Sequence, residues 1–585
     1  MIGAPMRYLR LLTNAVLGGV LIAGYVVVLI LQLNPQVPTL SMTSLGWLGA
    51  VLAFYVPYLS VGLYFLLLVA ELLSAEPFRP AWVSVRLLAW IAAVGATAAA
   101  LVTWVNLQAF RNVLTAASAE RLEDGAMATT VSAGVLVATA LWRYSFGRRG
   151  RRGAAGLLLS AMLLSLAVPL WLRGPGEASV PSPRRWVSST PVALAPRVRV
   201  IALDGASLGF IRQRVAAGQL PNFGRLLDRG AVVDLATVRP TEAEPAWAAA
   251  ATGVSAPRNG VRSSGRYSVR AADAHVVDVL PDYCFASALV YQGFVRAEPH
   301  TAESLAVRPM WEILADYGLP SGTVGWPLTY PARAERGYLL SDRFDEATSS
   351  PLRLAAADAA DPTTAVDVAR EVFDAWQARP WQEILPAFAA RAEERPDLER
   401  VRWDHAYSEA AWRLEQRFAP RLTAVRYEAL DTLGHGHLRD AQPERFGDPR
   451  RSDPQRSILD RYYTFIDHEV GQALRRLAPG DLLLVVAAFG MEPAALTRRL
   501  LARLLGVSGL SGTHDEAPDG FLLAYGTNVA SGQFRRGAIV DLAPTVLYYL
   551  GLPVGRDMDG FARTDLFVRS FALERPVRYV ASHER

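Results

Sequence analysis

The stretch Val198-Arg-Val-Ile-Ala-Leu-Asp204-Gly-Ala-Ser207 begins a region in which short apolar segments alternate with helical ones. Its first six residues predict a buried strand, and the Asp-Gly-Ala-Ser sequence after them predicts a turn. A second stretch, Leu482-Leu-Leu-Val-Val-Ala-Ala-Phe-Gly490, predicts another buried strand that runs into a glycine turn. This alternation predicts an α/β domain over residues 197–585, with a mainly parallel sheet between layers of helices.

Other segments of this domain follow the same pattern. Strands are predicted at Ala231–Val238, Ser321–Trp326, Leu422–Leu430 and Phe521–Tyr525, and helices at Leu220–Arg229 and Ile458–Leu477. Residues 352–421 differ, because they are rich in Ala, Arg and Glu and have helical periodicity. They predict a helical cap inserted into the domain, and such insertions often set substrate or partner choice.

The first 172 residues hold five long apolar runs. Each is about long enough to cross a hydrocarbon core of ~30 Å as a helix. The runs are Leu11–Leu33, Leu45–Leu73, Leu87–Val105, Ala126–Trp142 and Ala154–Leu172. We therefore expect a membrane domain of five transmembrane helices over residues 1–172. Residues 173–196 are rich in Pro, Ser and Gly and predict an exposed linker.

Positive charge in the connecting loops predicts the orientation of these helices. Arg7 and Arg10 precede the first run, and the loop Arg143-Tyr-Ser-Phe-Gly-Arg-Arg-Gly-Arg-Arg152 holds five arginines and no acid. Loops of this kind stay in the cytoplasm. We expect a multi-pass protein of the plasma (inner) membrane with a cytoplasmic N-terminus and a periplasmic or extracellular C-terminal domain, so that the lipid bilayer is its first partner.

Net charge and cysteine content bear on nucleic-acid binding and on disulfide bonds. The net charge of +5 over 585 residues is modest, and part of it lies in the predicted cytoplasmic loops. It gives no indication of nucleic-acid binding. The chain has one cysteine, Cys284, which excludes an intramolecular disulfide.

Candidate metal ligands lie near the predicted strand ends, where α/β sheets place their sites. Asp204 follows the first strand, and Asp431 follows the strand predicted at Leu422–Leu430. His435 comes four residues after Asp431, so a helical turn would place both side chains on one face. These groups suit a zinc-type ion, and His514 would add a third ligand and leave one position open. The same spacing also fits a surface or capping role, so spacing alone leaves both interpretations open.

The chain from Arg199 to Phe567 resembles the type I phosphodiesterase/nucleotide pyrophosphatase branch of the alkaline phosphatase superfamily. The resemblance rests on the order of several short motifs. These are Val200-Ile-Ala-Leu-Asp204-Gly-Ala-Ser207, Leu220-Pro-Asn-Phe-Gly-Arg-Leu-Leu227, Pro245-Ala-Trp247 with Thr252-Gly253, Trp326-Pro-Leu-Thr-Tyr-Pro331, Gly512-Thr-His514, Asp519-Gly-Phe-Leu-Leu-Ala524, Leu542–Pro553 and Asp557-Met-Asp-Gly560. It implies an alkaline-phosphatase-like fold, bound divalent metals and an ancestral activity on phosphate esters.

In that family, one metal is held by an Asp-x-x-x-His element and a later histidine. The resemblance assigns these roles to Asp431, His435 and His514. The second metal is held by the aspartate after the first strand, which corresponds to Asp204, together with a nucleophilic Thr or Ser and an Asp-His pair.

The remaining family positions of the second metal carry no donor in this chain. Alignment on Pro245-Ala-Trp247 places the nucleophile at Ala243, and the Asp-His pair falls on Ala488 and Phe489. The resemblance therefore predicts one bound divalent metal, zinc, and an empty second site. Two metals normally clamp the attacking and leaving oxygens of the displacement, and one of them activates the nucleophile.

Neighbouring residues offer substitutes for the missing nucleophile. Thr241 lies two residues before Ala243, and Glu242 and Glu244 flank it. Thr241 or Glu242 would have to take over the role from a shifted position, and a misplacement of ~1 Å already costs much of the rate.

Three functions remain open at this stage. The first is a membrane-anchored, catalytically degenerate phosphodiesterase relative, a pseudoenzyme that binds a phosphorylated or lipid-linked ligand or a membrane protein partner, with at most one metal. The second is an active one-metal phosphoester hydrolase or phosphoryl-group transferase acting near the membrane. The third is a membrane assembly or scaffold protein.

Overall fold

A computed structural model describes residues 3–73, 81–145, 151–174, 196–269, 272–349, 356–386, 396–447, 457–504, 509–514 and 518–584. The chain divides into two compact units. One unit comprises Met1–Ser179 together with Gly265–Pro299, and the other comprises Val180–Ser264 together with His300–Arg585. Most of the predicted linker, residues 175–195, lies outside the described residues.

The N-terminal part of the first unit forms five long helices in its described residues. They are α1 (Gly3–Leu33), α2 (Met42–Leu73), α3 (Val85–Phe110), α4 (Ala116–Ser145) and α5 (Arg151–Leu172). By length and composition, α1 to α4 are candidate membrane spans within the described residues. The part of α5 counted as an apolar helix, Gly156–Leu172, is shorter. Four of the five predicted spans are thus found as candidates, and the fifth stays a prediction.

The first unit also contains a three-stranded antiparallel sheet built by Gly265–Pro299, which the sequence analysis assigned to the C-terminal domain. Its strands are β3 (Gly265–Val269), β4 (Ala272–Val277) and β5 (Arg296–Pro299), in the order β4-β3-β5. Val277 and Val295 share an apolar core with Trp47 and Phe54 of α2. The side chain of Asn34 donates to the carbonyl oxygen of Val279 at 2.7 Å and accepts from the backbone of the same residue at 2.9 Å.

The second unit is organised around a single large mixed sheet. Its main order is β14-β2-β13-β10-β1-β9-β6-β7-β8, and β15 pairs with β2. The central strands from β10 to β7 are parallel, whereas β13 is antiparallel to both of its neighbours. The strands are β1 (Val198–Leu203), β2 (Ala231–Ala236), β6 (Ser321–Val324), β7 (Gly337–Leu340), β8 (Ala360–Asp361), β9 (Leu422–Tyr427), β10 (Leu482–Phe489), β13 (Asp519–Tyr525), β14 (Gly532–Gln533) and β15 (Gly537–Ala538). The predicted α/β domain with a mainly parallel sheet is confirmed.

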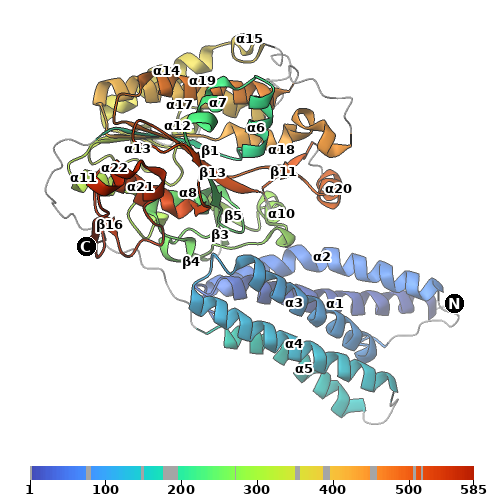
Figure 1. Ribbon diagram of the computed structural model, residues 1–585. Coiled ribbons are helices and arrows are strands. Elements are labelled where there is room, and N and C mark those ends of the chain that lie inside the picture. The colour runs from blue at the N-terminus through green and yellow to red at the C-terminus, as the bar shows by residue number, and fades with distance from the viewer. Residues whose placement is uncertain are drawn as a thin grey trace. The chain divides into compact units, whose positions relative to one another are not determined.

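Helices cover both faces of this sheet (Figure 1). Alternate side chains of β1 enter two separate cores, with Ile201 and Leu203 on one face and Val200 and Ala202 on the other. This two-sided burial explains why the central strands are almost continuously apolar. The first face is covered by α6 (Leu208–Ala216), α7 (Pro221–Arg229), α14 (Thr363–Ala378), α17 (Pro396–Phe418) and α19 (Ile458–Arg476), and the second by α8 (Ala243–Thr252), α11 (Met310–Asp316), α21 (Leu542–Tyr549) and α22 (Arg569–Glu574).

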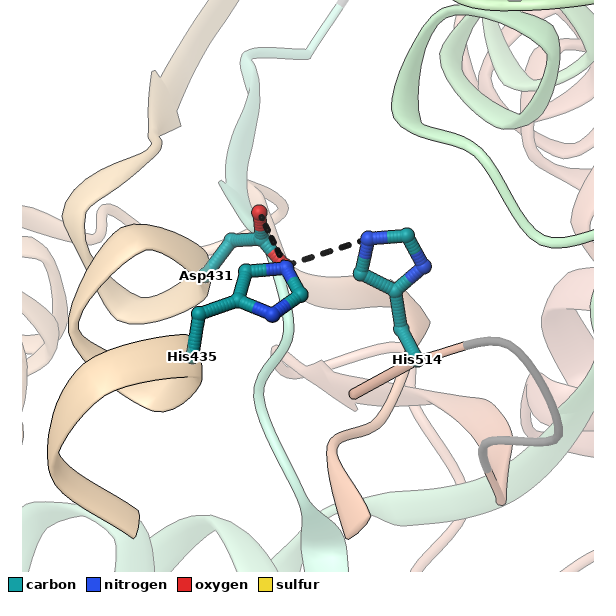
Figure 2. A group of neighbouring side chains, drawn as sticks. All are labelled: Asp431, His435 and His514. Atoms are coloured by element: carbon teal, nitrogen blue, oxygen red, sulfur yellow. Dashed lines mark ion pairs between the residues drawn. The ribbon is translucent and has the colours of Figure 1, made fainter. Parts of the chain in front are cut away.

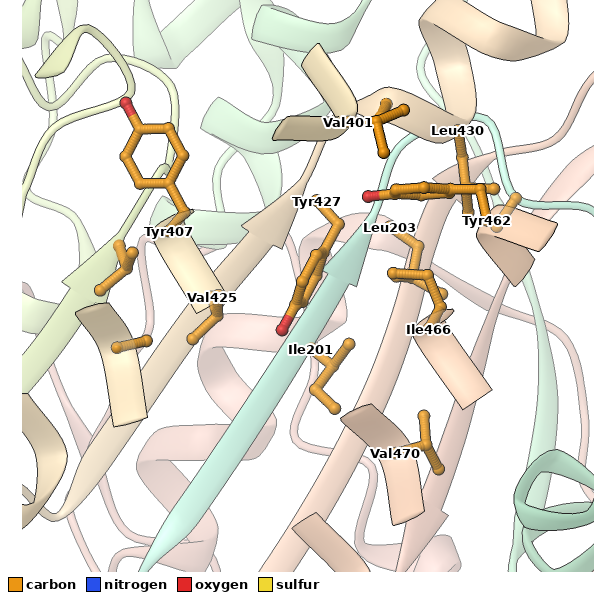
Figure 3. Close-up of a cluster of buried hydrophobic side chains, with 14 of the residues drawn as sticks. Ile201, Leu203, Val401, Tyr407, Val425, Tyr427, Leu430, Tyr462, Ile466 and Val470 are labelled. Carbon is orange, nitrogen blue, oxygen red and sulfur yellow. The ribbon is translucent and has the colours of Figure 1, made fainter. Parts of the chain in front are cut away.

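In its described part, the segment predicted as a helical cap forms the helices α13 (Ala356–Ala359), α14, α15 (Trp381–Ile384) and α17, and it also contributes the edge strand β8. Two of these helices belong to the layer that lies directly on the sheet. Val401 and Tyr407 of α17 pack in the same core as Val425 and Tyr427 of β9 (Figure 3). Residues 350–355 and 387–395 of this region lie outside the described residues.

One strand is shorter than predicted, and this affects the candidate site. The strand predicted to reach Leu430 ends at Tyr427, and helix α18 (Ala429–Ala441) begins two residues later. Asp431 therefore lies in the first turn of a helix instead of closing a strand. The remaining helices and strands are short, namely α9 (Ala256–Asn259), α10 (Ala286–Tyr291), α12 (Phe344–Ser349), α20 (Leu496–Leu504), β11 (Glu492–Pro493), β12 (Gly512–Thr513), β16 (Val554–Gly555) and β17 (Tyr579–Val580).

Candidate metal site

Helix α18 presents two of the predicted metal ligands on one face. Asp431 and His435 are one turn apart, and the Nε2 atom of His435 lies 3.7 Å from the Oδ2 atom of Asp431 (Figure 2). A carboxylate in the first turn of a helix is also favoured by the helix dipole. The expected common face of these two side chains is therefore present.

The third predicted ligand, His514, reaches the same place from the short strand β12. Its Nε2 atom lies 3.9 Å from the Oδ1 atom of Asp431 (Figure 2). The strand approaches α18 closely at Gly512, where an added Cβ would lie 2.3 Å from the carbonyl oxygen of Gly434. The backbone N–H of Ser511 donates to the carbonyl oxygen of His435 at 2.7 Å. Glycine at position 512 thus allows the two histidines to meet.

The geometry of these three residues fits one zinc-type ion. Their ligand atoms all lie within 4.8 Å of one another. Tetrahedral zinc with bonds of about 2.0–2.1 Å holds its ligand atoms roughly 3.4 Å apart, so small rotations would complete the site. The Oδ1 atom of Asp431 is buried and has no hydrogen-bond partner. Three protein ligands leave a fourth position open for another molecule.

Protonation and hydrogen bonding also suit both histidines to metal binding. The Nδ1 atom of His435 lies 3.0 Å from the carbonyl oxygen of Gly512, so an Nδ1–H would donate there and leave Nε2 directed at Asp431. Burial, together with the neighbouring His435, lowers the pKa of His514 to about 4, which keeps its imidazole neutral at pH 7. Burial raises the pKa of Asp431, and His435 partly offsets this effect.

The fourth predicted ligand, Asp204, lies at the end of β1 and is engaged elsewhere. Its Oδ2 atom accepts hydrogen bonds from Nε and Nη2 of Arg426, at 3.0 and 2.5 Å. Its Oδ1 atom accepts from the indole N–H of Trp247 at 2.5 Å. Burial raises the pKa of Asp204 to about 6 although the charge of Arg426 opposes this shift. The structure therefore gathers three of the four predicted ligands and pairs Asp204 with an arginine.

The positions that the resemblance assigned to the missing donors are apolar and close to Asp204. Ala243 is the first residue of α8, the helix that also carries Trp247. Ala488 and Phe489 end strand β10 and are fully buried. The ring of Phe489 packs against that of His514, with 5.1 Å between the ring centroids. Apolar side chains thus occupy the positions at which the motif resemblance predicted metal-binding side chains.

The two candidate substitutes for the nucleophile differ in their surroundings. The carboxylate of Glu242 accepts a hydrogen bond from the backbone N–H of Ser264. The hydroxyl of Thr241 is buried and has no hydrogen-bond partner, while the Thr241 backbone interacts with the ring of His514. Thr241 is therefore next to the candidate metal ligands, whereas the carboxylate of Glu242 is engaged by the backbone of Ser264.

Sequence reasoning missed Arg426 as a member of this site. A charged residue between Val425 and Tyr427, inside a strand predicted to be buried, is a signal that a carboxylate must face it. The sequence does not reveal that this carboxylate is Asp204, because the pairing depends on the register of β1 against β9.

Comparison with known proteins identifies the family. Residues 198–532, more than half of the chain, match the family model described as type I phosphodiesterase / nucleotide pyrophosphatase. The chain belongs to this family. The resemblance inferred from the motifs is thereby confirmed, and Asp431, His435 and His514 form a candidate metal-binding trio in a metal-dependent family.

Comparison with solved structures gives further matches at low sequence identity. Mouse ectonucleotide pyrophosphatase/phosphodiesterase 5 is 12% identical, with 64% of this chain and 100% of that chain covered and a TM-score of 0.38. The human protein of the same name is 13% identical, with 63% and 99% covered and a TM-score of 0.36. A variant of alkaline phosphatase PafA is 12% identical, with 64% and 100% covered and a TM-score of 0.41. No individual curated protein sequence matches significantly.

Proposed function

We propose that this chain is a membrane-anchored, extracytoplasmic phosphodiesterase relative that binds a ligand through one divalent metal and has lost two-metal catalysis. The observation that carries the proposal is the asymmetry of the site. Asp431, His435 and His514 converge within 4.8 Å, whereas Ala243 and Phe489 offer no donor atom to a second ion.

The chemistry of the missing groups supports a binding role. An alanine methyl group has no lone pair with which to attack phosphorus, and loss of a nucleophile in another hydrolase class costs on the order of 10⁶ in turnover. A zinc ion held by the three ligands would supply Lewis-acid attraction for an anionic oxygen of the ligand. The open fourth position would orient that oxygen.

The membrane unit indicates which class of ligand the site would encounter. The four candidate spans, the arginine-rich loop after the fourth span and the predicted fifth span at Ala154–Leu172 together favour an inner-membrane location with the family domain on the outer side. A phosphorylated or lipid-linked molecule would be available there, as would a phosphorylated membrane protein. These ligands share an anionic phosphate oxygen, the group that one metal with an open position would bind.

The test uses the full-length protein in detergent. We expect one zinc ion per chain by elemental analysis and no hydrolysis of phosphate mono- or diesters above the rate of buffer with zinc. His435→Ala should abolish zinc binding, whereas His437→Ala, which changes the same helix outside the trio, should preserve it. Ester turnover in the wild-type protein that His435→Ala abolishes would overturn the proposal. A protein that holds no zinc in either form would favour the scaffold function.

One observation favours an active one-metal hydrolase as the second candidate. The buried hydroxyl of Thr241 has no partner, and its backbone interacts with His514. If Thr241 is the nucleophile, Thr241→Val should abolish turnover and Thr241→Ser should retain part of it. Equal rates for both variants would exclude this candidate.

A further inference from the structure

The guanidinium of Arg426 makes polar contacts through all three of its nitrogen atoms. Nε and Nη2 donate to Asp204, and Nη1 lies 3.3 Å from Oε2 of Glu428 and 3.4 Å from the carbonyl oxygen of Gly325. Only 6% of the Arg426 side chain and 1% of the Asp204 side chain are exposed. A fixed, fully bonded cation therefore lies against the aspartate at the end of the first strand.

This aspartate lies where the donors of a second metal would have to meet. Strand β1 pairs with β10 in parallel, with Leu203 opposite Ala487, so that Asp204 is next to Ala488. Trp247, which donates to Asp204, lies one turn after Ala243 on helix α8. Asp204 thus lies where strands β1 and β10 and helix α8 meet, and both of its carboxylate oxygens already accept hydrogen bonds.

The surrounding charges require a cation at this place. Burial raises the pKa of the Glu244 and Asp342 carboxyl groups, and the nearby charge of Arg426 partly offsets this rise in both. Burial would raise the pKa of Glu428, but Arg426 and Arg400 together lower it below its usual value. Arg400 also pairs with Glu428, but Asp204 is paired with Arg426, so removal of Arg426 would leave the buried charge of Asp204 uncompensated.

We propose that Arg426 replaces the second metal ion as a built-in cation, which closes that half of the site to divalent metals. This inference rests on the proposed one-metal function and specifies how the second metal was lost. Arginine keeps its charge at every physiological pH and presents its donors in a rigid fork. It has no vacant coordination position, so it cannot bind and ionise a hydroxyl. The replacement neutralises the pocket and removes the means of activating a nucleophile.

The principal test counts divalent ions in two engineered proteins. The first carries Ala243→Thr, Ala488→Asp and Phe489→His, which restore the donors of the second site, and the second adds Arg426→Ala. We expect the second protein to bind one more zinc ion per chain than the first. Equal ion numbers in the two folded proteins would overturn the proposal. The difference does not depend on whether the trio binds metal, so the failure of the proposed function remains distinguishable.

A second measurement remains informative if the multiple variants do not fold. Arg426→Ala alone should lower the unfolding temperature, and added Mn²⁺ should recover part of the loss, because an ion can then neutralise Asp204 and Glu428. Arg426→Lys should gain less from Mn²⁺. Arg199→Ala is the matched control, since Arg199 is a buried arginine of β1 paired with Glu415, away from the site. The proposal would be overturned if Mn²⁺ raised the unfolding temperature of Arg199→Ala as much as that of Arg426→Ala. It would also be overturned if Mn²⁺ raised neither.

Discussion

The two halves of the site differ in what they leave open to solvent. In the half formed by α18 and β12, the side chains of His435, His514 and Asp431 are 34%, 18% and 20% exposed. In the half formed by β1 and β9, Asp204 and Arg426 are almost completely buried. The first half can therefore exchange a ligand, and the second cannot. Loss of one metal site thus need not empty a pocket, because an internal ion pair can take the place of the ion.

The largest expected effect comes from breaking the ion pair in the closed half. Arg426→Met should destabilise the protein by about 3–5 kcal/mol, because it leaves Asp204 buried and uncompensated. The double variant with Asp204→Asn should lose less than the sum of the two single losses. Thermal and denaturant unfolding followed by tryptophan fluorescence measure this coupling. Additive losses would mean that the pair has no energetic role.

The open half should lose its metal when one ligand is removed. His514→Ala should weaken zinc binding by more than about 100-fold, because the loss of an outer-shell partner alone already costs about 10–100-fold. Calorimetric titration of zinc into the metal-free protein measures this change. His468→Ala, on helix α19 outside the trio, is the matched control and should leave the affinity unchanged. A weak effect of His514→Ala would remove it from the ligand set.

A smaller, pH-dependent effect arises in α17, outside both halves. Burial lowers the pKa of His405 to about 4, so the folded protein stays neutral there while the unfolded chain takes up a proton below pH 6.5. Stability should therefore fall as the pH drops from 6.5 to about 4. His405→Gln should reduce the fall of the unfolding temperature across this window by several degrees, because glutamine takes up no proton in the unfolded chain.

The neighbouring residue provides a control of opposite sign. Burial raises the pKa of Asp404 to about 7, so the folded state keeps a proton that the unfolded chain releases near pH 3.8. Stability should fall as the pH rises through this range, and Asp404→Asn should remove that loss. Parallel pH profiles for His405→Gln and Asp404→Asn would contradict both assignments. These two profiles give the background against which pH effects of variants in the site can be judged.

The smallest expected effect tests the closed half directly. Ala243→Thr alone should change neither the number of bound ions nor the ester turnover, because Asp204 remains paired with Arg426 and Ala488 still lacks a donor. Elemental analysis and an ester assay on the same preparation measure both quantities. A gain of turnover from this single change would mean that the closed half accepts a nucleophile, which would end the contrast between the two halves.

Much of the fold and half of the site could be predicted from the sequence. Strand β1 has the predicted bounds, and the spacing of Asp431 and His435 predicted their common helical face. These features depend on local periodicity, which a sequence displays directly. The role of Arg426 depends on pairing between strands that are more than 200 residues apart, and no local pattern contains that register.

The segment Gly265–Pro299 makes the two units difficult to separate, because it belongs to the first unit although the chain on both sides of it belongs to the second. The polypeptide passes between them three times, after residues 179, 264 and 299. Proteolysis within the predicted linker would cut only one of these covalent passages. A fragment expressed from residue 197 onward would carry Val277 and Val295 without the Trp47 and Phe54 side chains that cover them. Such a fragment would expose an apolar surface and aggregate, so the phosphodiesterase-family domain is expected to be stable only as part of the whole chain.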